Sequence, residues 1–191
     1  MIVTTMEAEG ALPEWVELLP AGPRLVGTDG REWVNDAPEA ILSAFQVEPS
    51  LVIDWEHASE LRATQGLSAP AAGWVDQLES RDGAIWGHVQ RWTETAARQI
   101  LAGEYRHLSP VFLYEKNTGR IRKLVSAGLT NHPNLPLVAL NRADGTQVAT
   151  GATFETSAAL RAEFGTLERY RAYQAAHHAG QARVYPPEGS R

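Results

Sequence analysis

The chain has 191 residues, a length typical of one good-sized domain with a small appendage. Its net charge of −6 and its lack of any Lys/Arg run argue against a nucleic-acid partner. The absence of cysteine excludes disulfides, thiolate nucleophiles and thiolate metal sites. The N-terminus lacks the features of a signal peptide and no segment approaches a membrane span, so we expect a soluble protein.

The first third of the chain predicts two strands and a helix. Residues 12–19 have the pattern of a short strand, and residues 37–46 that of a short helix with Pro38 in its first turn. Residues 51–57 (LVIDWEH) show the clearest strand pattern in the chain, and residues 58–70 are polar and small, as in a mobile loop.

A hairpin is predicted next, from residues 71–79 and 84–92 joined by the turn SRDG. A helix is expected at about 94–102, with Thr93 as its N-cap and Gly103 just after its end.

Two further strands are predicted at 107–115 and 121–130, joined by the turn KNTG. Short strands mixed with a few helices indicate an α+β fold, mainly an antiparallel sheet closed into a barrel with flanking helices. We therefore expect a barrel domain over residues 1–145. Residues 146–182 are expected to form a linker and an amphipathic helix, and residues 183–191 a disordered tail.

Strand periodicity bears on a metal site near DWEH. If the strand extends through all of residues 51–57, its side chains alternate between two faces. One face then carries Leu51, Ile53, Trp55 and His57, and the other carries Val52, Asp54 and Glu56. On that expectation, Asp54 and Glu56 point away from His57, and the three do not form one ligand set. HExxH and phosphate-binding glycine motifs are also absent, so we expect no metal and no cofactor.

Ser109 is the serine of most chemical interest, because it lies within a strand and precedes a proline. The residue before a proline adopts extended geometry, so Ser109 does not begin a helix. Pro110 lacks an N–H and supplies no oxyanion donor, which a nucleophile elbow would require. A Ser-Pro pair on a strand is, on its own, more often structural.

Histidines lie at three places that suit a partner for this serine. His57 ends a hydrophobic strand, where a hydrogen-bonded core histidine is the ordinary interpretation. His107 lies two residues before Ser109 and on the same strand face. His132 lies in a loop, TNHPN, where functional residues concentrate. Composition and spacing alone leave the chain as a soluble α+β domain.

The order of several sequence blocks is more specific. ELLPAG, TDGREW, LVIDWEHAS, PAAGWVDQLE, the long block ending in YRHLSPVF, and LVSAGLTNHPNL follow one another between about residues 14 and 142. In this order they closely resemble the phage Mu-like prophage I protein family. The resemblance implies a prohead maturation protease, similar to other tailed-phage prohead serine proteases and remotely to the herpesvirus assemblins.

That resemblance implies site residues, substrates and a location. The His of DWEH makes His57 the general base, and the Ser of HLSP makes Ser109 the nucleophile. The scaffold, the major capsid protein and the chain itself are the implied substrates or docking partners. The implied location is the prohead, in the host cytoplasm. A homodimer stays open, because assemblins are activated by dimerisation.

The third member of the triad is less well defined by the resemblance. Assemblins use a second histidine downstream of the serine, and His132 has about the right place. His107, Asp54 and Glu56 remain alternatives. An oxyanion water held by Arg142 or Arg106 is equally open, although strand alternation puts Arg106 on the face opposite Ser109.

Two other functions remain to be compared with the protease. A non-catalytic scaffold or docking module would have no need of His57 and Ser109 together. A metal-dependent hydrolase using His57, His107 and His132 would lose activity to a chelator and resist serine reagents.

Overall fold

The computed structural model describes residues 11–141, 166, 168–169 and 182–184. Seven strands form one sheet, in the order β1-β6-β5-β4-β8-β7-β9. Their bounds are β1 Trp15–Leu19, β4 Leu51–Trp55, β5 Gly73–Arg81, β6 Ala84–Trp92, β7 His107–Tyr114, β8 Ile121–Thr130 and β9 Ala182–Val184. A separate two-stranded sheet consists of β2 Arg24–Val26 and β3 Glu32–Val34.

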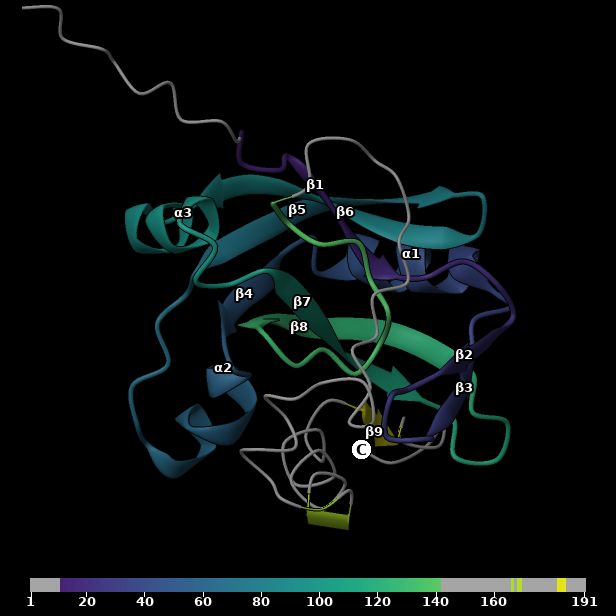
Figure 1. Ribbon diagram of the computed structural model, residues 1–191. Helices are drawn as coiled ribbons and strands as arrows, with labels where there is room; N and C mark the ends of the chain where they lie inside the picture. Colours follow the sequence, from purple (N-terminus) through teal and green to yellow (C-terminus); the bar gives the residue numbers. More distant parts are fainter. Residues whose placement is uncertain (1–10, 142–165, 167, 170–181, 185–191) are drawn as a thin grey trace, which may run out of the picture.

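Within residues 11–141, four short helical segments flank the sheet (Figure 1). They are the α-helices α1 Pro38–Val47, α2 Ala58–Leu61 and α3 Glu94–Leu101, and the 3₁₀ turn η1 Ala63–Gln65. The helix α3 begins as predicted, because the side chain of Thr93 accepts a hydrogen bond from the amide of Ala96 at 3.3 Å. It ends as predicted too: Gly103 has φ +71°, the left-handed conformation that a glycine adopts most easily after a helix. Among the described helices, none is long and apolar enough to cross a membrane.

The large sheet is mixed, and it curls into a half-barrel. The pairs β1–β6, β6–β5, β5–β4 and β8–β7 are antiparallel, as the strand pattern predicts. The central pair β4–β8 is parallel, a feature that the prediction of a mainly antiparallel barrel did not include. A parallel pair needs a long crossover, and here the hairpin β5–β6, helix α3 and strand β7 together provide it. Strand β1 lies close to β7 across the curl.

Two predictions about the DWEH region are corrected by the structure. Strand β4 ends at Trp55, two residues earlier than the pattern LVIDWEH predicts. Glu56 and His57 then both take left-handed backbone angles, with φ of 51° and 59°. The following residues, expected to be a loop, include α2 and η1. The chain therefore turns sharply directly after β4.

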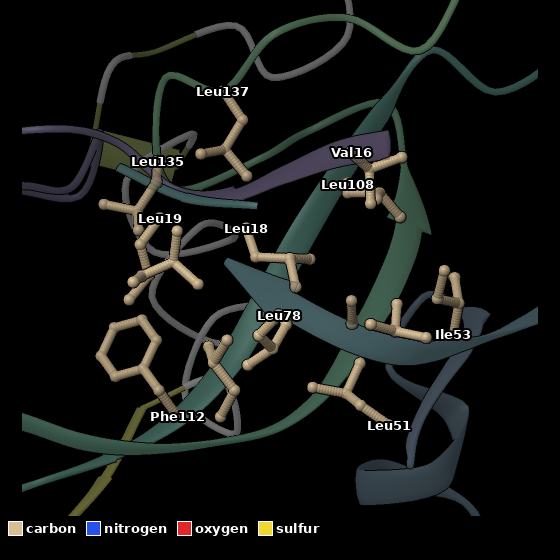
Figure 2. Close-up of a cluster of buried hydrophobic side chains, with 14 of the residues drawn as sticks. Val16, Leu18, Leu19, Leu51, Ile53, Leu78, Leu108, Phe112, Leu135 and Leu137 are labelled. Carbon is tan, nitrogen blue, oxygen red and sulfur yellow. The ribbon is translucent and has the colours of Figure 1, made fainter. Parts of the chain in front are cut away.

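The hydrophobic core lies inside the curl of the large sheet. Figure 2 shows Leu18 and Leu19 of β1 in one cluster with Leu51 and Ile53 of β4 and Leu108 of β7. Leu135 and Leu137, which follow β8 and its TNHPN loop, cover one side of this core. Because one face of β4, β7 and β8 is apolar, their alternate residues form a second, polar face, and that face carries the site described below.

The predicted C-terminal segments cannot be compared with the structure over most of their length. Apart from residues 166, 168–169 and 182–184, the predicted linker and helix (146–182) and tail (183–191) lie outside the described residues. Strand β9 pairs parallel with Phe112–Tyr114 of β7.

Candidate active site

The turn after β4 places His57 on the polar face of the sheet. A Cβ added to Gly128 of β8 would lie 3.0 Å from both Cε1 and Nδ1 of the His57 ring and 2.9 Å from its backbone nitrogen. The imidazole therefore sits directly over Gly128. This corrects the strand-based expectation that His57 points away from Asp54, because alternation ends at Trp55 and Gly128 is the register partner of Asp54.

Ser109 reaches the same place from the other side of β8. In the antiparallel pair β7–β8, Ser109 is opposite Gly128, and residues paired across a sheet project from the same face. The side chains of Ser109 and His57 thus lie on the same face of the sheet, at the level of Gly128. Both residues have 0% exposed surface, and within the described part of the chain the Ser109 hydroxyl has no hydrogen-bond partner.

Asp54 completes a row of three residues across the sheet. It pairs with Gly128 from the β4 side, so Asp54, Gly128 and Ser109 stand at one level on three neighbouring strands. Asp54 is also 0% exposed, and its Oδ2 accepts a hydrogen bond from the Ser59 amide at 2.7 Å. Burial raises the pKa of Asp54, and hydrogen bonds from Ser59 oppose that rise.

His132, His107 and Glu56 gather one level further along the sheet, around Thr130. The Thr130 hydroxyl donates to Glu56 Oε2 at 3.1 Å and accepts from the His132 amide at 3.1 Å. His107 is the register partner of Thr130 on β7. Burial raises the pKa of Glu56, while Thr130 and His132 lower it. Burial lowers the pKa of His107, as do the charges of Arg106 and His132.

Helix α2 lies on the other side of the row formed by Asp54, Gly128 and Ser109. The hydroxyl of Ser126, a β8 residue on the polar face, donates to Glu60 Oε1 at 3.1 Å. Ser59 and Glu60 of α2 are therefore tied to β4 and β8 respectively. This fixes the short helix that follows His57.

Of the two arginines expected to hold an oxyanion water, the structure describes Arg106 but not Arg142. Arg106 lies near the turn after α3, where its Nε and Nη2 are both 3.9 Å from the position of a Cβ on Gly103. Arg142 lies outside the described residues.

The described residues include no group of three His, Asp or Glu side chains arranged to hold a metal ion. The three histidines of the hydrolase alternative are divided between two levels, with His57 over Gly128 and His107 beside Thr130. This arrangement does not favour a shared metal.

Sequence reasoning missed Gly128, the residue over which the site is assembled. A glycine inside a strand often marks close approach of another group, and the segment SAGL carries that signal. Asn134 was missed as well. It is 3% exposed and is hydrogen-bonded to the turn at residues 27–31, so it anchors the loop that carries His132.

Comparison with known proteins is consistent with the resemblance noted in the sequence. The chain is 34% identical over 135 residues to Protease I of Escherichia phage Mu, a match covering 62% of this chain and 37% of that protein. It is 36% identical over 138 residues to the Mu-like prophage FluMu I protein of Haemophilus influenzae, covering 63% and 38% respectively. The chain thus spans less than two fifths of the length of these relatives. No solved structure matches it.

The family described as Mu-like prophage I protein, N-terminal domain, matches residues 16–141. That range contains every strand of the half-barrel apart from the first residue of β1 and the short β9, and it includes both His57 and Ser109. The chain therefore belongs to the Mu-like prophage I protein family.

Proposed function

We propose that this chain is a serine endopeptidase of phage head assembly, with Ser109 as nucleophile and His57 as general base. The observation that carries the proposal is the position of both side chains on one sheet face at the level of Gly128. The Ser109 hydroxyl is buried and has no hydrogen-bond partner within the described part of the chain, which leaves its proton available to a base. The name Protease I of the phage Mu relative supports a proteolytic role.

The proposed chemistry is acyl transfer in two steps. His57 takes the proton of the Ser109 hydroxyl as Oγ attacks the scissile carbonyl carbon, and then gives that proton to the departing amine. The C–N bond breaks and an ester to Ser109 remains. Water, deprotonated by His57, then attacks the ester and releases a carboxylic acid, which regenerates Ser109.

His132 is the proposed third member of the triad. Its loop position matches that of the second histidine in the assemblins, and the Glu56–Thr130 hydrogen bond lies beside it. His107 competes for the same role, because it faces Thr130 from β7. His132→Gln and His107→Gln should be compared: the variant of the true third member loses most of the activity and the other retains it.

The proposed substrates are the scaffold, the major capsid protein and the chain itself, inside the prohead. Because Ser109 and His57 have no exposed surface, a peptide must displace whatever covers them before it reaches Oγ. An enzyme that acts once per capsid tolerates such slow access. Dimerisation, as in the assemblins, is one proposed means of opening the site.

The test combines a covalent probe with a cleavage assay. The full chain is incubated with diisopropyl fluorophosphate, and intact mass with peptide mapping locates the adduct. In parallel, it is co-expressed with the scaffold and major capsid proteins of its own phage, and fragments are followed by mass. Wild type should be labelled on Ser109 and should produce discrete fragments.

Three variants serve as comparisons for both assays. Ser109→Ala and His57→Gln should abolish labelling and cleavage. Ser126→Ala removes another buried hydroxyl from the same sheet face and should leave labelling at Ser109 intact. Identical fragments from wild type and Ser109→Ala would exclude the serine mechanism. The absence of fragments in both, together with capsid binding, would favour a docking module.

A further inference from the structure

We propose that Asp54 is the positioning residue for His57, holding the turn that carries it and orienting its imidazole toward Ser109. The inference rests on the proposed function and changes one part of it: on this geometry Asp54, in place of His132, is the residue placed to contact the second ring nitrogen of His57. Asp54 and Ser109 stand at one level on β4 and β7, with only Gly128 of β8 between them. Two strand spacings separate them, about 10 Å between Cα atoms. The His57 ring occupies the space above Gly128, the residue that separates Asp54 from Ser109 in this row.

The first contribution of Asp54 is conformational. Glu56 and His57 are consecutive non-glycine residues with left-handed backbone angles, each costing roughly 1 kcal/mol or more. Such a turn persists only when surrounding contacts hold it. The Asp54 carboxylate provides them, because Oδ2 accepts the Ser59 amide at 2.7 Å and the His57 amide also donates to this carboxylate.

The second contribution of Asp54 is to orient the imidazole of His57. It depends on Oδ1, the carboxylate oxygen that has no hydrogen bond to the turn after β4. Oδ1 of Asp54 is buried and has no hydrogen-bond partner within the described part of the chain. The same is true of Oγ of Ser109, at the other end of the row. An imidazole has two ring nitrogens. One nitrogen directed to each of these oxygens would satisfy both atoms and would arrange acid, base and nucleophile in one line.

The other acidic groups near Asp54 have hydrogen-bond partners of their own. Glu60 of α2 and Glu56 after β4 are the acidic groups that face it, and Glu60 raises the pKa of Asp54. Glu60, however, accepts the hydroxyl of Ser126, and Glu56 accepts that of Thr130. Asp54 is therefore the carboxylate at the level of His57, and it is the one placed to stabilise an imidazolium there.

The test compares wild type with Asp54→Asn, which keeps an oxygen for the Ser59 amide but removes the charge. The control is Glu60→Gln, which removes a neighbouring charge that faces Ser126. Two readouts are measured between pH 5 and 9. One is the titration of the His57 ring nitrogens by NMR, assigned with His57→Gln. The other is the rate at which diisopropyl fluorophosphate labels Ser109. Thermal unfolding checks that each variant is folded.

In Asp54→Asn we expect the His57 titration to move to lower pH, since a stabilising negative charge is lost. We expect labelling of Ser109 to slow by roughly 100-fold or more. Glu60→Gln should leave the labelling rate within a few-fold of wild type. An unchanged His57 titration together with an unchanged labelling rate in a folded Asp54→Asn would overturn the proposal.

Failure of the underlying protease proposal would look different. Wild type itself would then show no labelling at Ser109 at any pH, whereas the NMR titration would still report whether Asp54 interacts with His57. A shift of that titration without any labelling of wild type would preserve the contact and remove its catalytic role.

Discussion

Gly128 is the residue on which the candidate site depends most directly, because no side chain fits between it and His57. A methyl group there would lie 2.9 Å from the His57 backbone nitrogen and 3.0 Å from the ring. Neither neighbour is the free end of a flexible chain, since the backbone of His57 is fixed by the turn after β4. Any larger residue must therefore push His57 away from Ser109.

We predict that Gly128→Ala lowers the free energy of unfolding by about 1–3 kcal/mol, the usual cost of overpacking a buried position. Labelling of Ser109 should fall by roughly 100-fold or more if His57 is the base, because a displacement of about 1 Å of a catalytic base has that effect. Chemical denaturation and probe labelling measure the two quantities.

Gly87→Ala is a matched control for this substitution. A Cβ at Gly87 of β6 would meet Leu18 at 2.8 Å and Val75 at 2.9 Å, which is similar crowding on a strand that carries none of the site residues. It should lose stability and keep its labelling rate. Equal loss of labelling in both variants would mean that crowding acts through the fold and not through His57.

At the scale of elements, the loop after β8 is held by the turn at residues 27–31. The side-chain oxygen of Asn134 accepts from the Thr28 hydroxyl at 3.2 Å and the Asp29 amide at 3.3 Å. Its Nδ2 donates to Asp29 Oδ2 at 3.1 Å. A glycine is needed at position 27, because a Cβ there would lie only 2.7 Å from the side-chain oxygen of Asn134. Two segments far apart in sequence thus fix the loop that carries His132.

We predict that Asn134→Ala lowers the free energy of unfolding by about 2 kcal/mol, because buried partners lose their hydrogen bonds. If His132 is the third member of the triad, labelling of Ser109 should fall about as far as in His132→Gln. Thr28→Ala removes one hydroxyl and should cost only about 1 kcal/mol. Wild-type labelling in a destabilised Asn134→Ala would argue that His132 does not act in catalysis.

At the scale of the whole molecule, the segment after the TNHPN loop spans the gap between β1 and β7. The amide of Val138 donates to Oε2 of Glu17 on β1 at 2.9 Å, and the amide of Leu140 donates to the carbonyl of Arg106, just before β7, at 2.8 Å. Glu17 is only 5% exposed. Burial raises its pKa, against the effect of the Val138 amide.

The pH dependence follows from that direction. Between the ordinary and the raised pKa of Glu17, the folded chain holds a proton that the unfolded chain has lost. Stability therefore falls as pH rises through this window, and the full penalty is present above the raised pKa. We predict that Glu17→Gln, which keeps the acceptor for Val138, raises the thermal midpoint at pH 7. The difference from wild type should vanish below about pH 4. A variant less stable than wild type at pH 7 would contradict this account.

The small sheet is joined to the large one through aromatic packing. Trp33 of β3 meets Phe112 of β7 edge to face, with ring centroids 5.2 Å apart and an interplanar angle of 87°. Each is 2% exposed. We predict that Phe112→Ala costs about 3–5 kcal/mol in the free energy of unfolding, whereas Phe112→Leu costs less than about 1.5 kcal/mol. Urea denaturation distinguishes the two, and equal costs would mean that volume does not govern this contact.

Much of the fold followed from local patterns in the sequence. The hairpin β5–β6, the capped helix α3 and the strands β7 and β8 were predicted within a few residues, because alternation, a threonine cap and turn residues act over short distances. Ser109 and His57 were picked out through the resemblance of the HLSP and DWEH segments to a known family. Nothing in their spacing, more than fifty residues apart, places them together.

Only the tertiary structure decided how those residues meet. The alternating sequence pattern predicts that β4 extends through His57. In the folded chain the strand ends earlier, because Glu56 and His57 take left-handed backbone angles in a turn that Asp54 contacts. The parallel pairing of β4 with β8 is likewise invisible in either strand alone, yet it brings Asp54, Gly128 and Ser109 to one level. Sequence pattern reports what each segment prefers. The register between distant strands is set by burial of their shared apolar face, and that is a property of the assembled sheet.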